Sequence, residues 1–471
     1  MRYIQFFQFF AKPILIGIKA NHEKNITRRT FMQQAATAAM ASTLIAPRLS
    51  FAAPPSSKLQ HAAIGVGGQG ASDLGQINSS GKVDVVALCD IDAGNLERAS
   101  KLYPNARLYR DWREMLEQED NTIDSVNVAT PDHTHAPASM TAIRKGKHIY
   151  CEKPLTHDVY EARKVTLAAR KAGVATQMGN QIHSHDFYRT AVQWMQEGAI
   201  GKIKEWHSWS AAGYGLRAEI CKNGRVRPAT SDPVPAEVEW DLWLGTAPER
   251  PFKLDYYHKF YWRLWRDFGG GETGDFGCHI FDPIFTALGV KDPLTVTCQT
   301  ENISQEMWPH WIQAEYVFKG TELCANDTII GTWSDGGKKG DPSLSPHLPK
   351  DFALPNAGSM VIGEEGTMII PHVNTPSMYP VEKYKSYPTP KLVPLNHYHD
   401  FVEGALGNGT PGSHFDYAGP LTETVQLANI ANRFPGKTLE WNAKRLKFTN
   451  SREANKYIRR EYRDGWDVKG L

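Results

Sequence analysis

The chain has 471 residues, a formal net charge of +2, and contents of 41% hydrophobic and 22% charged residues. This length allows two or three domains with a large core, and the composition is ordinary for a globular protein. The near-neutral charge argues against a basic binding surface, so we expect no nucleic-acid partner. None of the six cysteines forms a Cys-x-x-Cys pair, so neither a zinc site nor a disulfide scaffold is expected. Cys89, Cys151 and Cys278 lie in or beside apolar runs and are expected to be buried free thiols.

The first 53 residues are typical of an export leader. Arg28 and Arg29 precede a mildly apolar, Ala-rich run over Ala35–Ala46, and small residues follow near Ala53. Twin arginines before a weak apolar region resemble a Tat signal, which carries folded proteins; a Sec-type leader with a chance Arg-Arg is the alternative. A misplaced start codon would explain the charged apolar run over residues 1–24. We therefore expect a leader over residues 1–53 and a periplasmic mature protein.

Residues 58–180 alternate short apolar runs with helical segments. Nearly continuous apolar strands that alternate with helices predict a doubly wound parallel sheet, hence an N-terminal Rossmann domain of α/β class. The expected strands are Ala62–Val66, Val83–Cys89, Ser125–Val128, His148–Cys151 and Ala175–Met178. The expected helices are Ala71–Asn78, Asn95–Leu102, Asp111–Glu117, Ala136–Lys145 and Val159–Ala172.

Residues 181–445 have a different pattern, in which polar and apolar residues alternate within the strands. This pattern predicts a second, α+β domain with a large, mostly antiparallel sheet, followed by a C-terminal tail over residues 446–471. Residues 336–357 are rich in Gly, Pro, Ser and Lys and predict a long loop. The expected strands are Lys202–Ser210, Leu294–Gln299, Ala314–Phe318, Cys324–Thr332, Met360–Gly363 and Thr367–Ile370. The expected helices are Phe187–Glu197, Tyr398–Leu406 and Thr422–Arg433.

The first strand runs into a Gly-x-Gly-x-x-Gly loop over residues 65–70. Gly65 permits a tight turn, Gly67 lets the backbone approach a pyrophosphate, and Gly70 allows close packing of helix and strand. Asp90 ends the next strand, where an acid accepts hydrogen bonds from ribose hydroxyls. No basic residue directly follows Asp90, since Ile91 comes next, so NAD is favoured over NADP. A glycine-rich turn with a helix-capping Asp is the alternative interpretation.

Two further strand ends carry polar residues. Thr130 to His135 follow the strand that ends at Val128, where they would border the nicotinamide side of a cleft or simply cap a helix. Glu152 and Lys153 follow the strand His148–Cys151, and Pro154 stops that strand. Ligands bind at the carboxyl ends of such strands, so Lys153 is expected to face the crevice. An exposed ion pair at a strand end is the alternative.

In their order and spacing, these motifs resemble the Gfo/Idh/MocA oxidoreductase family. The resemblance covers the chain after the leader, and the second-domain signature Asp-x-x-x-His of that family matches Asp275 and His279. Four positions apart, these two residues share one helix face. The run Gly269-Gly270-Gly271 before them is expected to let the backbone come close to a ligand. The alternative interpretation is a helix-capping Asp275 and a satisfied core His279.

Hydride transfer from an alcohol carbon needs a base for the hydroxyl proton and a positive group for the developing alkoxide. His279 suits the first role and Lys153 the second, while Asp275 would orient the imidazole or hold a sugar hydroxyl. The catalytic residues are therefore predicted to be Lys153, Asp275 and His279. Cofactor contacts are expected from Gly65, Gly67, Gly68, Gln69, Gly70, Asp90, Ile91, Thr130, Pro131, His133, His135, Glu152, Lys153 and Asn180. Substrate contacts are expected from Gln181, His183, Trp262 and Arg263, with core packing as the alternative for the aromatic segment that holds the last two.

The resemblance implies an exported, NAD-linked oxidoreductase acting on a sugar, sugar derivative or polyol, with a cofactor that stays bound. The alternative is a glycoside hydrolase that uses transient oxidation by NAD. A third class, a non-catalytic sugar-binding protein, is disfavoured because Lys153, Asp275 and His279 are all present. A homo-oligomer that pairs through the second-domain sheet is expected from the relatives.

Overall fold

The computed structural model describes residues 58–211 and 227–471. The expected leader, its twin arginines, most of the segment between Ala53 and Leu59, and Cys221 lie outside the described residues. Within the described ranges, no helix combines the length and the apolar character that a membrane span requires. Cys89, Cys151 and Cys278, together with Cys298 and Cys324, are buried free thiols, as expected for the first three.

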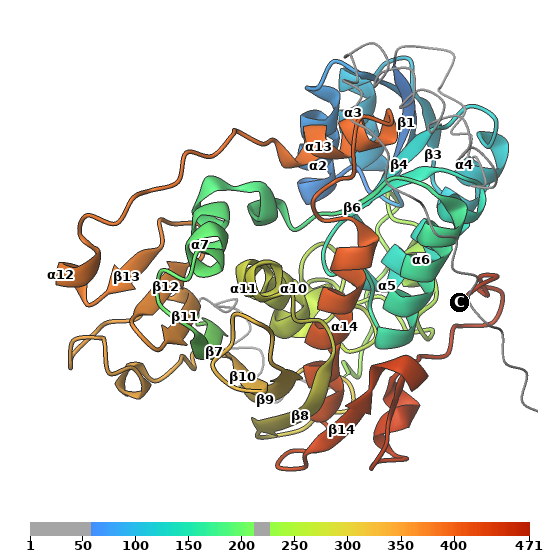
Figure 1. Ribbon diagram of the computed structural model, residues 1–471. Coiled ribbons are helices and arrows are strands. Elements are labelled where there is room, and N and C mark those ends of the chain that lie inside the picture. The colour runs from blue at the N-terminus through green and yellow to red at the C-terminus, as the bar shows by residue number, and fades with distance from the viewer. Residues whose placement is uncertain (1–57, 212–226) are drawn as a thin grey trace, which may run out of the picture. The chain divides into compact units, whose positions relative to one another are not determined.

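The N-terminal part is a six-stranded parallel sheet with the order β3-β2-β1-β4-β5-β6 (Figure 1). This is the order of a doubly wound dinucleotide-binding sheet, so the predicted fold class is confirmed here. The strands are β1 (Leu59–Ile64), β2 (Val83–Cys89), β3 (Arg107–Tyr109), β4 (Ser125–Val128), β5 (His148–Cys151) and β6 (Thr176–Met178). The helices between them are α2 (Gly68–Asn78), α3 (Ala93–Leu102), α4 (Trp112–Gln118), α5 (Asp132–Arg144) and α6 (Val159–Ala172).

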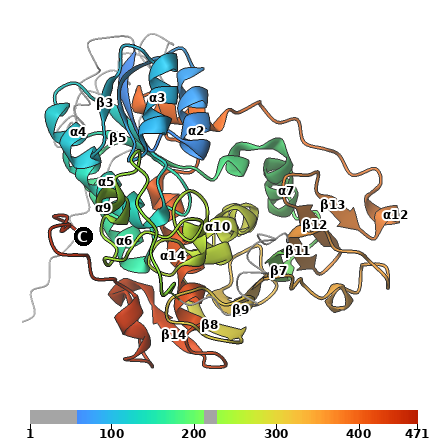
Figure 2. The ribbon, with the colours of Figure 1, turned by 180° about the vertical axis from the view of Figure 1, so that it is seen from behind.

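The C-terminal part is a nine-stranded sheet, mostly antiparallel as predicted, with the order β13-β12-β11-β7-β10-β9-β8-β14-β15 (Figure 2). Strands β7 and β10 pair in parallel, and the other described neighbours are antiparallel. The strands are β7 (Ile203–Ser210), β8 (Pro293–Thr300), β9 (Ile312–Lys319), β10 (Thr328–Asp335), β11 (Ala357–Gly363), β12 (Thr367–Pro371), β13 (Ser377–Tyr379), β14 (Leu439–Asn442) and β15 (Lys447–Phe448). The predicted loop over residues 336–357 is irregular apart from one short 3-10 turn, Pro342–Leu344.

Helices fill the space between the two sheets. Helix α14 packs against both α6 and α10, and α10 also contacts β7, β10 and β11. Helix α13 returns to the N-terminal part and packs on α2, so the chain crosses between the two sheets more than once (Figure 1). The helices after β6 are α7 (Asp186–Gln196), α9 (Trp240–Leu244), α10 (Gly271–Ile280), α11 (Asp282–Leu288), α12 (Val381–Tyr384), α13 (His397–Ala405) and α14 (Phe415–Ala431). Besides Pro342–Leu344, the described 3-10 turns are Gln181–Ser184, Tyr261–Leu264, Ala443–Arg445 and Ala454–Tyr457.

Local sequence explains most element ends. Helix α6 begins with a capping box between Asp158 and Glu161, and ends at Gly173, whose φ of 66° suits a left-handed cap.

Two differences from the expected elements stand out. Helix α14 begins at Phe415, ahead of the expected Thr422, despite Pro420 in its second turn. Strand β3 was not expected, because three residues with two exposed side chains carry no apolar pattern.

Candidate active site

A cavity of about 660 Å³ lies at the carboxyl ends of the parallel strands. It runs from Asp90, after β2, to His279 on α10, so both parts of the fold contribute to its wall. Fourteen of the predicted site residues line it: Gly65, Gly67, Gly68, Gln69, Asp90, Ile91, Thr130, Pro131, Glu152, Lys153, Gln181, Trp262, Arg263 and His279. The others, Gly70, His133, His135, Asn180, His183 and Asp275, are not part of this lining.

The glycine loop is as tight as its sequence suggested. Gly65 has a φ of +82°, and a Cβ there would lie 2.4 Å from the carbonyl oxygen of Ala129. A Cβ on Gly70 would lie 2.0 Å from the carbonyl oxygen of Gly65, so this glycine acts through packing and not at the cavity surface. Helix α2 starts after Gly67, which has no capping side chain, so its first turn presents N–H groups toward the cavity end of the loop.

Asp90 is buried and tied to this loop. Its carboxylate accepts hydrogen bonds from the backbone N–H groups of Val66 and Asp92, both at 2.9 Å. Burial raises the pKa of Asp90, and the two N–H groups oppose that rise. The guanidinium groups of Arg98 and Arg110 line the same end of the cavity, a feature that spacing after Asp90 did not reveal.

The two histidines after β4 have structural positions. The ring nitrogens of His133 lie 3.2 Å and 2.9 Å from the carbonyl oxygens of Phe268 and Trp243. Those of His135 lie 2.8 Å from the carbonyl oxygens of Pro154 and Thr130. Burial lowers the pKa of both, to about 3 for His133 and about 4 for His135, while the two carbonyl oxygens at each ring oppose that shift. They brace the loops that form the cavity wall.

Asp132, one residue earlier, does line the cavity. Its side chain is only 2% exposed, and its Oδ2 accepts a hydrogen bond of 2.8 Å from the N–H of Gly270. Burial, and to a smaller extent the negative charge of Asp275, raise the pKa of Asp132 to about 7. This carboxyl group therefore titrates within the physiological pH range inside the cavity.

Lys153 and Asp275 form an ion pair inside the fold. The Lys153 ammonium donates to Oδ1 of Asp275, and Nε of Arg263 lies 3.5 Å from Oδ2 of the same carboxylate. Burial lowers the pKa of Lys153, but the Asp275 and Glu152 carboxylates outweigh that effect, so the pKa is raised and the amine stays charged. Asp275 thus holds two cations at the cavity wall, although it does not line the cavity itself.

Glu152 lies beside this pair. Its Oε1 accepts a hydrogen bond of 2.5 Å from the Gln181 amide. Burial and the negative charge of Asp73 raise the pKa of Glu152 well above its ordinary value. A Cβ on Gly179 would lie 2.3 Å from the same Oε1, so the backbone directly after β6 packs closely against this carboxyl group.

His279 is one helical turn after Asp275 and faces the cavity. Its Nδ1 is buried with no hydrogen-bond partner among residues 58–211 and 227–471, so the alternative of a satisfied core histidine does not describe it. Burial and the positive charge of Lys153 lower the pKa of His279 well below its ordinary value, so the ring is neutral. His372, which follows β12, lies near it with a ring-centroid distance of 5.6 Å and also lines the cavity.

The glycines Gly269, Gly270 and Gly271 at the start of α10 contact protein groups. A Cβ on Gly269 would lie 2.8 Å from the Trp262 ring, and one on Gly271 would lie 2.8 Å from the Trp308 ring. The close approach that was expected toward a ligand is therefore an approach of the backbone to two indole rings. Its effect is to seat α10, and with it Asp275 and His279, against the cavity wall.

The aromatic segment divides into a wall and a core. Trp262 and Arg263 line the cavity, with the Arg263 guanidinium 4.1 Å from the Trp262 ring centroid. Tyr257 and Trp265 are buried in a cluster with Phe268, as the core-packing alternative anticipated for part of the segment. His258, Lys259 and Phe276 also line the cavity.

Asn180 and His183 belong to a different network. The Asn180 amide donates to Asp282 at 2.9 Å, and His183 Nδ1 lies 2.9 Å from the same carboxylate oxygen. Tyr417 donates to it as well, at 2.6 Å. His183 lines a separate cavity of about 350 Å³ beside α7. Among the described residues, no group of three His, Cys, Asp or Glu side chains is placed to hold a metal ion.

Comparison with known proteins supports the interpretation of both parts. Residues 59–180 match the Gfo/Idh/MocA family, described as an oxidoreductase family with an NAD-binding Rossmann fold. Residues 210–327 match the C-terminal alpha/beta domain of the same oxidoreductase family. The two matched ranges together take in just over half of the chain.

The similar curated proteins include two classes of sugar enzyme. Glycosyl hydrolase family 109 protein 2 from Bacteroides fragilis is 32% identical over 163 residues, or 33% of this chain and 38% of that protein. Levoglucosan dehydrogenase from Pseudarthrobacter phenanthrenivorans is 32% identical over 106 residues, or 21% of this chain and 27% of that protein. The chain thus spans well under half of the length of these relatives.

Among solved structures, the WlbA dehydrogenase from Bordetella pertussis, in complex with NADH and UDP-GlcNAcA, has the same fold. The TM-score is 0.57 at 16% identity, and the match covers 82% of this chain and 99% of the other. Both matched domains are consistent with the glycine loop, the strand order of the parallel sheet and the Lys153 site. The chain therefore belongs to the Gfo/Idh/MocA oxidoreductase family.

Proposed function

We propose that the protein is an NAD-linked oxidoreductase that acts on a CH–OH group of a sugar, sugar derivative or polyol. One observation carries the proposal. Lys153, with its partner Asp275, and His279 meet at the same cavity that holds the glycine loop and Asp90. A cavity of this size and mixed polarity is typical of cofactor and substrate sites.

The described residues fit a dinucleotide. Gly67 and the uncapped first turn of α2 suit a pyrophosphate, and Asp90 suits ribose hydroxyls at one end of the cavity. Thr130, Pro131 and Glu152 would lie along the other half. When bound, NAD would supply the hydride acceptor. Preference for NAD over NADP rests on Asp90 and Ile91, and Arg98 and Arg110 are the groups that oppose it.

The side chains of the chain itself would handle the proton and the charge. The charged amine of Lys153 can donate to an oxygen on which negative charge develops, and Asp275 holds it in place. The neutral His279 ring is able to accept the hydroxyl proton, and none of its described neighbours holds Nδ1 in a hydrogen bond. Arg263 and Trp262 would contact the sugar beside the ion pair of Lys153.

The alternative is a redox-neutral glycosidase. Its support is the 32% identity to a glycosyl hydrolase family 109 protein, beside a similar identity to a sugar dehydrogenase. Transient oxidation of the sugar, elimination, addition of water and re-reduction would use the same Lys153 and His279 site. The product would then be a hydrolysed sugar instead of an oxidised one. The oxidation state of the cofactor would be unchanged after each turnover.

We further propose export of the folded protein by the Tat route, with the nucleotide loaded beforehand and retained. The support is the twin arginine at residues 28–29 before an Ala-rich run. A homo-oligomer formed through the nine-stranded sheet is part of the same proposal. It would leave the cavity at the ends of the parallel strands open.

A glycoside and polyol panel tests the activity. The purified protein is followed for nicotinamide absorbance and for released aglycone in the same samples. A net absorbance change supports a dehydrogenase, and aglycone release with no net change supports the hydrolase. Absence of both from every substrate would contradict the proposal.

A further inference from the structure

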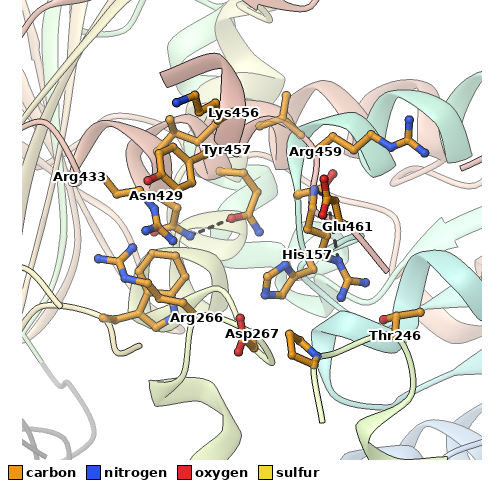
Figure 3. A pocket seen from close by; sticks show the side chains of 17 residues that line it. His157, Thr246, Arg266, Asp267, Asn429, Arg433, Lys456, Tyr457, Arg459 and Glu461 are labelled. Carbon is orange, nitrogen blue, oxygen red and sulfur yellow. Dashed lines mark hydrogen bonds and ion pairs between the residues drawn. The ribbon is translucent and has the colours of Figure 1, made fainter. Parts of the chain in front are cut away.

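A second cavity, of about 300 Å³, lies where α14 faces the C-terminal segment and the start of α6 (Figure 3). We call it the α14 cavity. It shares no lining residue with the cavity described above. Its wall is rich in basic side chains, namely Arg266, Arg433, Lys456, Arg459 and Arg460.

Arg266 is the unusual member of this wall. It is 4% exposed, and its Nε donates to the carbonyl oxygens of Ser304 and Met307 at 2.9 Å and 3.0 Å. Its Nη2 donates to Oδ1 of Asn432 at 3.0 Å. Its Nη1 is buried and has no hydrogen-bond partner in the described chain. The guanidinium lies 4.3 Å from the Trp308 ring centroid, but no carboxylate of the described residues forms an ion pair with it. Burying a cation without an anion costs free energy, and the described chain pairs no counter-charge with the Arg266 guanidinium.

Arg433 adds a second guanidinium at the same place. Its Nη1 donates to the side-chain oxygen of Gln305 at 2.9 Å, and its guanidinium lies 4.2 Å from the Tyr457 ring centroid. Figure 3 shows Arg266 and Arg433 next to each other on one wall. Burial, and then the positive charge of Arg433, lower the pKa of Arg266 well below its ordinary value, which is the signature of two neighbouring cations.

Among the described residues, no acidic side chain of the wall forms an ion pair with Arg266 or Arg433, although the charge of Asp267 partly offsets the lowering of the pKa of Arg433 by burial. Asp158 accepts from the backbone N–H of Arg460, and Asp267 accepts from the guanidinium of Arg250. Glu461 is exposed at the rim. The guanidinium groups of Arg266 and Arg433 are therefore the part of the wall that a bound negative group would stabilise.

We propose that the α14 cavity binds a small oxyanion, a carboxylate or a phosphate group, between Arg266 and Arg433. Two planar guanidinium groups match the oxygen geometry of such anions, and their desolvation in the cavity strengthens the contact. The volume of the cavity suits a small metabolite or a free ion better than a protein segment. This proposal does not depend on the function proposed above.

The position of the α14 cavity connects it to the active-site wall. Trp308 and Asn429 line it, and both donate hydrogen bonds of 2.7 Å to the segment Gly269–Gly271, at the carbonyl oxygens of Gly269 and Gly270. The N–H of Gly270 in turn donates to Asp132, which lines the main cavity. A single backbone segment thus separates the proposed anion from the main cavity, so occupancy should steady that segment.

Thermal unfolding of the full-length protein tests the proposal. Inorganic phosphate and acetate are titrated separately at constant ionic strength, with chloride as the balancing salt. We expect at least one of them to raise the midpoint in a saturable way, because a ligand that binds only the folded state stabilises it. The response to phosphate or to acetate identifies which source of oxyanion the site prefers.

Arg433→Gln locates the effect. It removes one charge-assisted contact at a half-buried position, so we expect the concentration needed for half the effect to rise about tenfold or more. Arg445→Gln, at an exposed arginine elsewhere, is the matched control and should behave as the unmodified protein. A response of Arg433→Gln to phosphate or acetate that equals that of the unmodified protein would overturn the proposal. This includes a response caused by anion binding at the glycine loop. So would the absence of any response beyond that of chloride.

Discussion

The ammonium group of Lys153 donates a hydrogen bond to the carboxylate of Asp275, a residue 122 positions later in the chain. The contact joins the end of β5 to the middle of α10, and the two side chains are 16% and 12% exposed. Because Asp275 lies on α10 and Lys153 follows β5 by only two residues, the amine is held at a defined place in the cavity wall.

Lys153→Met should lower turnover by about a hundredfold or more, since it removes the donor for the developing alkoxide. Folding should be retained, because Arg263 remains beside Asp275. Turnover is followed by nicotinamide absorbance and folding by circular dichroism. Lys101→Met changes an exposed lysine and serves as the control. Unchanged turnover in Lys153→Met would remove this residue from the mechanism.

Asp90→Ser combined with Ile91→Arg should move cofactor preference toward NADP. The change removes a negative charge beside the ribose and adds a positive one near Arg98 and Arg110. The ratio of the two dissociation constants should shift by about tenfold or more. Fluorescence titrations with each nucleotide measure it, and Asp84→Asn at an exposed site is the control. Tighter NADP binding by the unmodified protein would refute the preference for NAD.

The purified mature protein should contain nearly one nicotinamide nucleotide per chain. Outside the inner membrane a released cofactor would be lost, so retention requires slow dissociation. Denaturation, followed by an enzymatic assay of the supernatant, measures the content. Protein that is free of nucleotide and needs added NAD for every turnover would contradict both retention and the proposed export.

The pH dependence of stability should flatten in Asp132→Asn. The folded-state pKa of Asp132 is about 7, against an ordinary 3.8, because the group is buried. A raised pKa means that the folded state holds this proton more tightly than the unfolded chain does. The stabilisation is complete below pH 3.8 and is lost as the pH rises toward 7.

Asparagine keeps an acceptor for the Gly270 N–H but does not titrate. Unfolding midpoints between pH 4 and pH 8 test this expectation against Asp84→Asn. An equally steep profile in Asp132→Asn would show that other groups set the pH dependence.

Two glycines with nearly the same positive φ allow the effect of backbone strain to be distinguished from that of a side-chain clash. Gly271 and Gly289 have φ of +65° and +66°, but only at Gly271 does an added Cβ meet a neighbour, the Trp308 ring. Gly271→Ala should therefore destabilise the protein by about 1–3 kcal/mol more than Gly289→Ala. Urea unfolding of both variants measures the difference. Equal losses would show that the Trp308 contact does not seat α10.

Local patterns in the sequence were sufficient for the nucleotide-binding half. Strands β2, β4 and β5 and helix α6 have the bounds expected from their apolar runs. A buried parallel strand is apolar on both faces, and its bounds are therefore visible in the sequence. The glycine loop was equally clear from its spacing directly after the first strand, although the contact that requires Gly65 is with the distant backbone of Ala129. Short strands with exposed side chains, such as β3, lack that signal.

The tertiary structure decided which polar residues meet. Sequence spacing placed His133, His135, Asn180 and His183 near strand ends, but folding turned the first two toward backbone carbonyls and the last two toward Asp282. Only folding brought Asp132 and His372 to the cavity, because strand and helix periods set the direction of a side chain relative to its own element alone. The pairing of Arg266 with Arg433 has the same origin, since it depends on how the end of α14 packs against a loop 167 residues earlier in the sequence, a relation that no local pattern records.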